Sequence, residues 1–129
     1  MNLVTGATGH IGNVLVRDLV KRGEKVRALV LPGEDLSPID GIDLEICYGN
    51  VLDRESLHRA FDGVDYVFHL AGIISISSTE DATVRNVNVE GTRNMIEEAL
   101  KHEIKRFIYT SSIHAFKRIP HGTAINENT

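Results

Sequence analysis

The chain has 129 residues, 42% of them hydrophobic and 25% charged, which is typical of one globular domain with a real core. No apolar run approaches the roughly 20 residues that a membrane-spanning helix needs, and a net charge of −4 argues against nucleic acid as the main partner. The single cysteine, Cys47, excludes an internal disulfide and fits a reducing compartment, so we expect a cytoplasmic protein without a membrane partner.

Strand and helix patterns alternate along the chain. In chain order, the sequence predicts a strand over 1–4, a helix over 11–22, a strand over 26–31, a loop over 34–43, a strand over 44–48, a short helix capped by Asp53, a strand over 64–70, a loop over 73–79, a long helix over 81–102 and a strand over 104–110. Residues 113–129 show no clear period.

The two longer helices carry apolar residues at helical spacing. In the first helix these include Ile11, Val14, Leu15 and Leu19; in the long helix they include Val84, Val87, Gly91, Met95, Ala99, Ile96 and Leu100. Five strands that alternate with helices predict an α/β fold, a doubly wound parallel sheet with helices on both faces. Ligands of such sheets lie at the carboxyl ends of the strands.

A glycine-rich turn follows the first strand directly. Residues 5–12 read TGATGHIG, with Gly6, Gly9 and Gly12 spaced three apart between a strand and a helix. A tight turn needs backbone angles that glycine adopts at little cost, and without Cβ atoms a pyrophosphate can approach the helix N-terminus. The pattern favours a dinucleotide site over a turn without a ligand.

Four further motifs accompany this turn in order: GNVLD at 49–53, HLAG at 69–72, NVEGTRN at 88–94 and YTSS at 109–112. Together they resemble the extended short-chain dehydrogenase/reductase family, in its epimerase/dehydratase and dihydroflavonol-reductase-like group. The resemblance covers the chain up to about Ser112. It implies a Rossmann-type fold, a nicotinamide cofactor and a small-molecule substrate.

The resemblance also implies roles for individual residues. The cofactor would lie against the glycine turn, the segments after the third, fourth and fifth strands, and the long helix; these residues are Gly6, Thr8, Gly9, His10, Ile11, Gly12, Asn50, Val51, Leu70, Ala71, Gly72, Asn88, Thr110 and Ser111. The family usually has Asp where this chain has Asn50, which keeps a carbonyl acceptor for adenine.

Ser112 matches the family's catalytic serine, which hydrogen-bonds the substrate oxygen. A plain cap or turn is the alternative for a Ser-Ser pair after a strand. Ser75, Ser77 and Ser78 lie in the loop where substrate often sits in this family, and a solvated loop is the equal alternative.

The choice between NAD and NADP stays open in the sequence. An acid at the end of the second strand favours NAD, and an arginine there favours NADP, but this chain has Leu31 at that position. Arg27 lies inside the strand, and Glu34 and Asp35 come slightly late for the acid role.

The family's acid/base pair, a tyrosine four residues before a lysine, is missing. Residues four after Tyr48, Tyr66 and Tyr109 are Leu52, Leu70 and Ile113. We therefore expect residues 1–129 to be the N-terminal dinucleotide-binding part of a longer reductase, dehydrogenase or epimerase, nearly inactive alone. The resemblance also implies a homo-oligomer as one option, because members of the family often pair through the long helix. A non-catalytic cofactor-binding sensor or scaffold is the alternative.

The six histidines show no metal-ligand spacing. No pair of them stands four apart with a carboxylate partner, so the sequence predicts no metal site.

Overall fold

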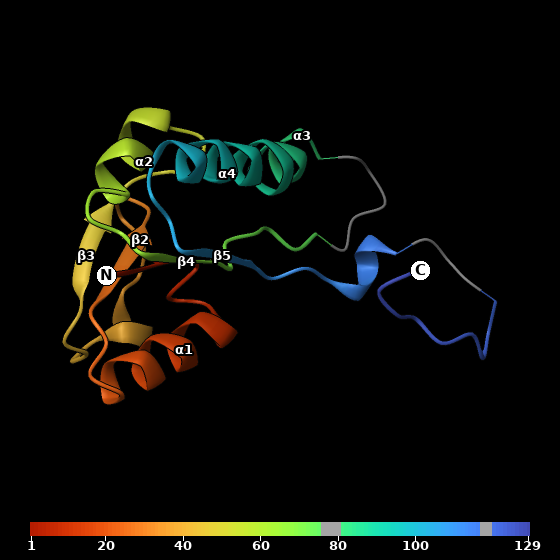
Figure 1. The fold of residues 1–129 in the computed structure, drawn as a ribbon, viewed down its shortest axis with the longest axis horizontal. Coiled ribbons are helices and arrows are strands. Elements are labelled where there is room, and N and C mark those ends of the chain that lie inside the picture. Colours follow the sequence, from red (N-terminus) through yellow and green to blue (C-terminus); the bar gives the residue numbers. More distant parts are fainter. Residues whose placement is uncertain (76–80, 117–119) are drawn as a thin grey trace.

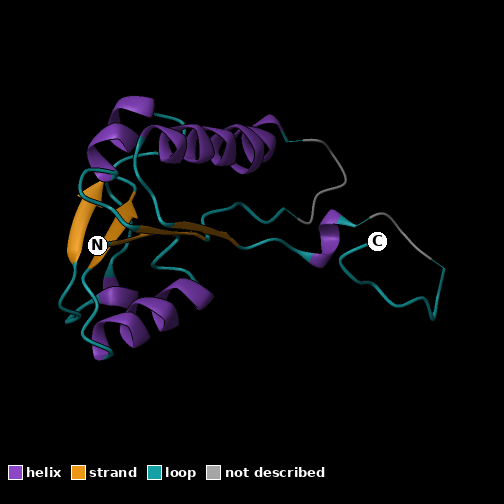
Figure 2. Cartoon of the chain, in the orientation of Figure 1, coloured by secondary structure: helices purple, strands orange, loops and turns teal. Residues whose placement is uncertain are grey.

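A computed structural model describes residues 1–75, 81–116 and 120–129. Five parallel strands form one sheet in the order β3-β2-β1-β4-β5 (Figures 1 and 2). The strands are β1 (Asn2–Thr5), β2 (Val26–Val30), β3 (Glu45–Tyr48), β4 (Tyr66–His69) and β5 (Arg106–Tyr109). The helices are α1 (His10–Lys21), α2 (Arg54–Ala60), α3 (Ala82–Arg85), the π-helical η2 (Asn86–Gly91) and α4 (Thr92–Lys101), with short 3-10 turns at η1 (Ser37–Ile39) and η3 (Ile113–Ala115).

The sheet lies between two helical layers, with α1 on one face and α2 and α4 on the other (Figure 1). Successive residues of a strand point to opposite faces, so the neighbours Leu3 and Val4 belong to different cores. Leu3 packs in a cluster with Leu57, Phe61 and Met95. Val4 packs under α1 in a second cluster, with Val16, Val26, Ala28, Val30 and Ile39.

The predicted doubly wound α/β sheet is confirmed, with all five strands inside their expected ranges or one residue beyond them. Two local features differ from the expectation. The predicted loop over 34–43 contains the 3-10 turn η1, and the predicted long helix passes through the π-helical segment η2. π-helical turns are wider than α-helical turns, and they are often found at functional sites.

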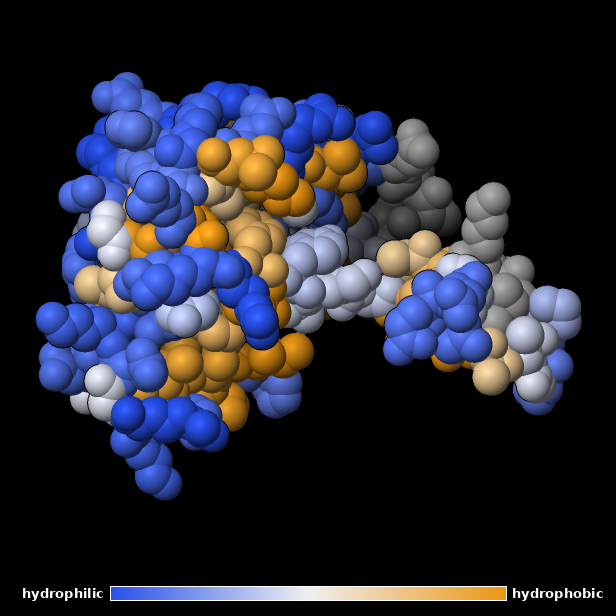
Figure 3. All heavy atoms as spheres, viewed as in Figure 1, coloured by the Kyte–Doolittle hydropathy of each residue, from blue (hydrophilic) through white to orange (hydrophobic). Residues whose placement is uncertain are grey.

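Several apolar helix residues that we expected on the buried side face solvent. Ile96 is 44% exposed and Leu100 is 81% exposed, whereas Asn94 and Glu98 are buried beside Met95. Ile11 and Val14 of α1 are likewise exposed, and Figure 3 shows apolar side chains at the surface over both helical layers. Each of these helices has apolar residues on more than one side, and the sheet covers only one side of each helix.

Glu98 connects the two helices of the upper layer. Its carboxylate accepts hydrogen bonds from His58 of α2 and from Lys101 and His102 at the end of α4. Burial raises the pKa of Glu98, but these three hydrogen bonds outweigh burial and the net pKa is lowered to about 2. The carboxylate is therefore ionised at neutral pH.

Among the described residues, no helix has both the length and the apolar character needed to cross a bilayer.

Candidate cofactor and active site

The carboxyl ends of parallel strands lie at one edge of the sheet, and most of the expected site residues follow such ends. The glycine turn follows β1, residues 70–72 follow β4, and residues 110–112 follow β5. β1 pairs with β4 and β4 with β5 in parallel register, with Thr5 opposite His69 and His69 opposite Tyr109. The topology therefore brings these three segments to one edge.

The glycine turn is shaped by close approach of the chain's own backbone. Gly6 has φ +70°, and a Cβ on it would lie 2.8 Å from the carbonyl carbon of Leu70. A Cβ on Gly12 would lie 1.9 Å from the carbonyl oxygen of Gly6, too close for any side chain. The Gly9 N–H closes the turn on the same oxygen at 3.1 Å. Gly6 and Gly12 are thus required by the protein fold itself, whatever ligand approaches.

The N-terminus of α1 has the features of an anion site. Its N-cap is Gly9, no side chain caps the helix, and the first turn contains no acidic residue. The first N–H groups of a helix have no intrahelical acceptor and lie at the positive end of the helix dipole. Gly9, His10 and Ile11 are exposed beside them and Thr8 is half-buried. These residues fit a pyrophosphate.

Glu34 extends an acidic side chain back to the end of β2. Its Oε2 accepts the Leu31 N–H at 2.7 Å, and its Oε1 accepts the hydroxyl proton of Thr8 in the glycine turn. Glu34 comes three residues after the position where an acid is expected, but the turn after β2 folds its carboxylate back to that position. Spacing alone did not identify this residue, because the return of the turn is a three-dimensional feature.

Arg27 faces away from this edge. Its guanidinium binds the carboxylate of Glu45 at 2.8 Å and donates at 2.7 Å to the carbonyl oxygens of Ala60 and Asp62, near the end of α2. Asp35 accepts from the Ser37 N–H and hydroxyl, which holds the pKa of its carboxyl below the usual value. Glu34 is therefore the one charged side chain of these three that reaches the glycine turn.

A buried hydrogen-bond chain joins β1, β4 and the long helix under the turn. Thr5 Oγ1 accepts the N–H groups of Leu70 and Ala71 and lies 2.7 Å from His69 Nδ1. His69 Nε2 lies 3.0 Å from Thr92 Oγ1, which donates to the carbonyl oxygen of Asn88 at 2.7 Å.

These partners define the protonation of the His69 ring. Thr5 uses its hydroxyl as an acceptor twice, so its proton points to Nδ1, and Thr92 donates to Asn88, so Nε2 carries the ring proton. Burial lowers the pKa of His69 to about 4. His69 is thus a neutral, doubly hydrogen-bonded core residue.

Asn88 holds the segment after β4. Its Oδ1 accepts the Ile73 N–H at 2.8 Å and its Nδ2 donates to the Ile73 carbonyl oxygen at 2.9 Å. Both polar atoms of its amide are thus engaged by the backbone of Ile73.

Asn50 and Val51 are arranged differently from one another. Asn50 is exposed, and its Oδ1 accepts the Leu52 N–H at 2.9 Å. Val51 is 8% exposed, and its carbonyl oxygen accepts from Asn94 of α4 at 3.0 Å. Asn50 alone of the two presents its side chain to solvent.

The segment after β5 is exposed from Thr110 through Ser112. Ser112 Oγ accepts the His114 N–H at 3.2 Å and caps η3, so the cap that we considered as an alternative is present. Ser75 is exposed in the segment after β4, and Ser77 and Ser78 lie outside the described residues.

Comparison with known proteins identifies the family. Residues 3–128 match the model of the 3-beta hydroxysteroid dehydrogenase/isomerase family. The chain is 43% identical to sterol demethylase protein B of Methylococcus capsulatus over 126 residues, 98% of this chain and 38% of that protein.

Two solved structures share the fold. One is a short-chain dehydrogenase/reductase superfamily protein from Agrobacterium tumefaciens with bound NAD (34% identity, TM-score 0.74, 87% of this chain and 32% of that one). The other is the UDP-glucose 4-epimerase of Thermus thermophilus in complex with NAD (27% identity, TM-score 0.85, 98% and 42%). The chain therefore spans less than half the length of these relatives.

The expected resemblance to short-chain dehydrogenases/reductases and epimerases is confirmed. The sheet order, the glycine turn and the match over nearly the whole chain agree. The chain belongs to the 3-beta hydroxysteroid dehydrogenase/isomerase family.

Proposed function

We propose that residues 1–129 form the NAD-binding, N-terminal portion of a longer oxidoreductase. The whole protein transfers a hydride between the nicotinamide cofactor and a carbonyl or hydroxyl group of a small substrate. The observation that carries this proposal is the uncapped N-terminus of α1 beside the glycine turn, at the carboxyl edge of the sheet. The two NAD-bound relatives support it.

The nicotinamide supplies hydride chemistry when it is bound, and this chain supplies binding and orientation. The N–H groups at the start of α1 hold the pyrophosphate, with Gly6, Thr8, Gly9, His10, Ile11 and Gly12 around it. Asn50 and Val51 flank the adenine, and residues 70–72 pass beneath the ribose. Thr5 holds this segment through the N–H groups of Leu70 and Ala71, and Asn88 holds the next residue, Ile73. Thr110 and Ser111 border the cofactor, and Ser112 orients the substrate oxygen.

Glu34 makes NAD the preferred cofactor in this proposal. Its carboxylate already accepts two hydrogen bonds at the end of β2, and such a group can accept from a ribose 2′-hydroxyl. A 2′-phosphate there would meet like charge, and Arg27 is engaged elsewhere.

The test uses the protein expressed from its complete gene. NADH binding is followed by fluorescence, and turnover is assayed with NAD and 3β-hydroxysteroids or UDP-glucose as probes. We expect saturable NADH binding, and a loss of about 10²-fold in kcat for Ser112→Ala with an unchanged Kd for NADH. A protein that binds neither NADH nor NADPH would refute the proposed cofactor site.

A non-catalytic NAD-binding sensor or scaffold is the second candidate. It is favoured by the absence, within residues 1–129, of a tyrosine followed four residues later by lysine. Reading the gene past codon 129 discriminates the two: a Tyr-x-x-x-Lys within a few tens of codons supports the enzyme, and a stop codon supports the module.

Two further expectations accompany the proposal. The single cysteine fits a cytoplasmic protein. The exposed Ile96 and Leu100 of α4 offer an apolar face for a homo-oligomer, which light scattering on the complete protein tests directly.

A further inference from the structure

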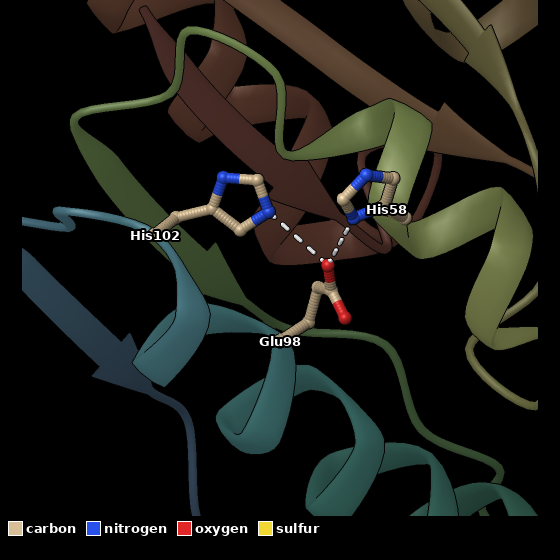
Figure 4. A group of neighbouring side chains, drawn as sticks. All are labelled: His58, Glu98 and His102. Atoms are coloured by element: carbon tan, nitrogen blue, oxygen red, sulfur yellow. Dashed lines mark hydrogen bonds and ion pairs between the residues drawn. The ribbon is translucent and has the colours of Figure 1, made fainter.

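One histidine of α2, His58, meets Glu98 and His102 from the end of α4 between the two helices (Figure 4). His58 Nδ1 lies 2.8 Å from Glu98 Oε1, and His102 Nε2 lies 3.1 Å from the same oxygen. The candidate ligand atoms of the three residues all lie within 4.8 Å of one another. No spacing pattern reveals the group, because His58 precedes Glu98 by 40 residues.

The group lies away from the cofactor site. His58 is near the end of α2, and Glu98 and His102 are at the end of α4. Both helices return from the carboxyl edge of the parallel sheet to its amino edge, where β4 and β5 begin. The cluster is therefore at the opposite edge from the glycine turn.

We propose that His58 Nδ1, Glu98 Oε1 and His102 Nε2 form a binding site for a divalent transition-metal ion, with Zn²⁺ as the best fit. Two imidazoles and one carboxylate are a ligand set that Zn²⁺ accepts. This proposal departs from the expectation of no metal site that sequence spacing supported.

The distances suit a small shift to metal geometry. Tetrahedral Zn²⁺ with bonds of about 2.0–2.1 Å separates its ligand atoms by roughly 3.3–3.4 Å. The separations from Oε1 are 2.8 and 3.1 Å, so each imidazole moves outward by roughly 0.2–0.6 Å. The two imidazole nitrogens lie at most 4.8 Å apart, and their separation also adjusts toward that value. The side chain of His58 is 70% exposed, so its ring has room to shift, and solvent can reach the ligand atoms from its side.

The surroundings favour a cation at this point. Both helices direct their C-terminal, negative ends toward the cluster, and Glu98 is a buried carboxylate with 3% side-chain exposure. Lys101 binds the other oxygen, Oε2, at 3.0 Å, so Oε1 remains the metal ligand. The Lys101 ammonium opposes the ion electrostatically, but its side chain is 58% exposed and screened by solvent.

Metal binding requires a rearrangement of ring protons. A carboxylate oxygen only accepts, so His58 Nδ1 and His102 Nε2 both carry protons in the metal-free arrangement. Each proton leaves the liganding nitrogen and the opposite ring nitrogen takes one up, which keeps both rings neutral. Metal binding thus ties α2 to α4 and stabilises the folded state by mass action.

The test is titration of the complete protein with Zn²⁺ by calorimetry, and with Co²⁺ by visible absorption. We expect one equivalent of Zn²⁺ per chain, a Co²⁺ spectrum of four-coordinate intensity, and a Tm that rises with Zn²⁺. His58→Ala is expected to weaken binding at least tenfold and to remove the Tm shift. Because His58→Ala also removes a hydrogen bond to Glu98, its metal-free Tm is expected to fall slightly, so the effect of Zn²⁺ is measured against the variant's own metal-free Tm. Its circular dichroism is expected to match that of the parent protein.

Two matched controls separate this site from adventitious binding. Glu97→Gln removes the neighbouring carboxylate of α4, and His121→Ala removes an exposed histidine; both are expected to leave Zn²⁺ affinity unchanged. Glu98→Gln, which keeps the size of the side chain and the Oε1 acceptor but loses the charge and the acceptor for Lys101, is expected to abolish the Co²⁺ band. Absence of saturable Zn²⁺ binding, or binding that survives His58→Ala or Glu98→Gln, would overturn the proposal.

Discussion

Thr5 Oγ1 and His69 Nδ1 lie 2.7 Å apart in the buried centre of the sheet, although 64 residues separate them in sequence. The same hydroxyl is the acceptor for the Ala71 N–H at 3.0 Å. One side chain thus joins the strand before the glycine turn to the segment expected beneath the cofactor, and it fixes how the two chain segments approach each other.

Thr5→Val keeps the shape of this side chain and removes its hydrogen bonds. The Ala71 N–H and His69 Nδ1 lose their partner, so we expect the free energy of unfolding to fall by about 1–3 kcal/mol. Urea denaturation measures the change. Thr110→Val, at an exposed position beyond β5, serves as the control and is expected to change stability by less than about 0.5 kcal/mol. Equal stability of Thr5→Val and the parent would contradict the assigned network.

The buried His69 makes stability depend on pH. Burial holds its folded-state pKa near 4, below the 6.5 expected when unfolded, so the unfolded state takes up the proton first. The contribution of neutral His69 to the free energy of unfolding is complete above about pH 6.5. It is lost as the pH falls toward 4, which lowers the free energy of unfolding by about 3 kcal/mol. Urea denaturation from pH 7.5 to 4.5 measures the slope. His69→Gln is expected to flatten it, and an unchanged slope in that variant would count against this assignment.

Glu34 is expected to determine cofactor choice. Glu34→Arg removes the acceptor for a ribose hydroxyl and adds a cation for a 2′-phosphate, so the NADH-to-NADPH affinity ratio is expected to fall at least tenfold. Fluorescence titration of the complete protein with both cofactors gives the ratio. The control is Asp35→Asn, which changes the neighbouring carboxylate that Ser37 holds. This variant should leave the NADH-to-NADPH affinity ratio unchanged. A Glu34→Arg protein that still prefers NADH as strongly as the parent would show that another residue selects the cofactor.

Gly12 and Gly9 are expected to respond differently to the same substitution. A Cβ on Gly12 would lie 1.9 Å from the Gly6 carbonyl oxygen, whereas one on Gly9 would lie 3.2 Å from it. Gly12→Ala is expected to cost about 3 kcal/mol, and Gly9→Ala less than about 1 kcal/mol because a small shift relieves the contact. Thermal denaturation of both variants provides the comparison. Similar losses would mean that the turn relaxes more than its geometry implies.

Local patterns were enough to predict the sheet. Leu3 and Val4 before a glycine turn, and five apolar runs separated by helical periods, specify alternating strands and helices, and right-handed crossovers then limit the topology. The glycine turn was found because its spacing is a backbone requirement, which the contacts of Gly6 and Gly12 now explain.

Contacts that form only when the chain folds back on itself could not be predicted from local sequence patterns. Glu34 reaches the glycine turn because the turn after β2 folds back, and Arg27 turns toward Glu45. Both the exposed Ile96 and the buried Met95 belong to the apolar pattern of α4. Only the position of the sheet decides which of the two is covered. His58 and His102 meet through helix packing alone.

The contact between Gly6 and the Leu70 carbonyl also sets an order of events during synthesis. The turn is encoded among the first residues, yet the surface that shapes it arrives 64 residues later. At about 5–20 residues per second, the ribosome needs roughly 3–13 s to supply it. A nascent chain that ends before β4 therefore presents the whole glycine motif without the Leu70 backbone that packs against Gly6.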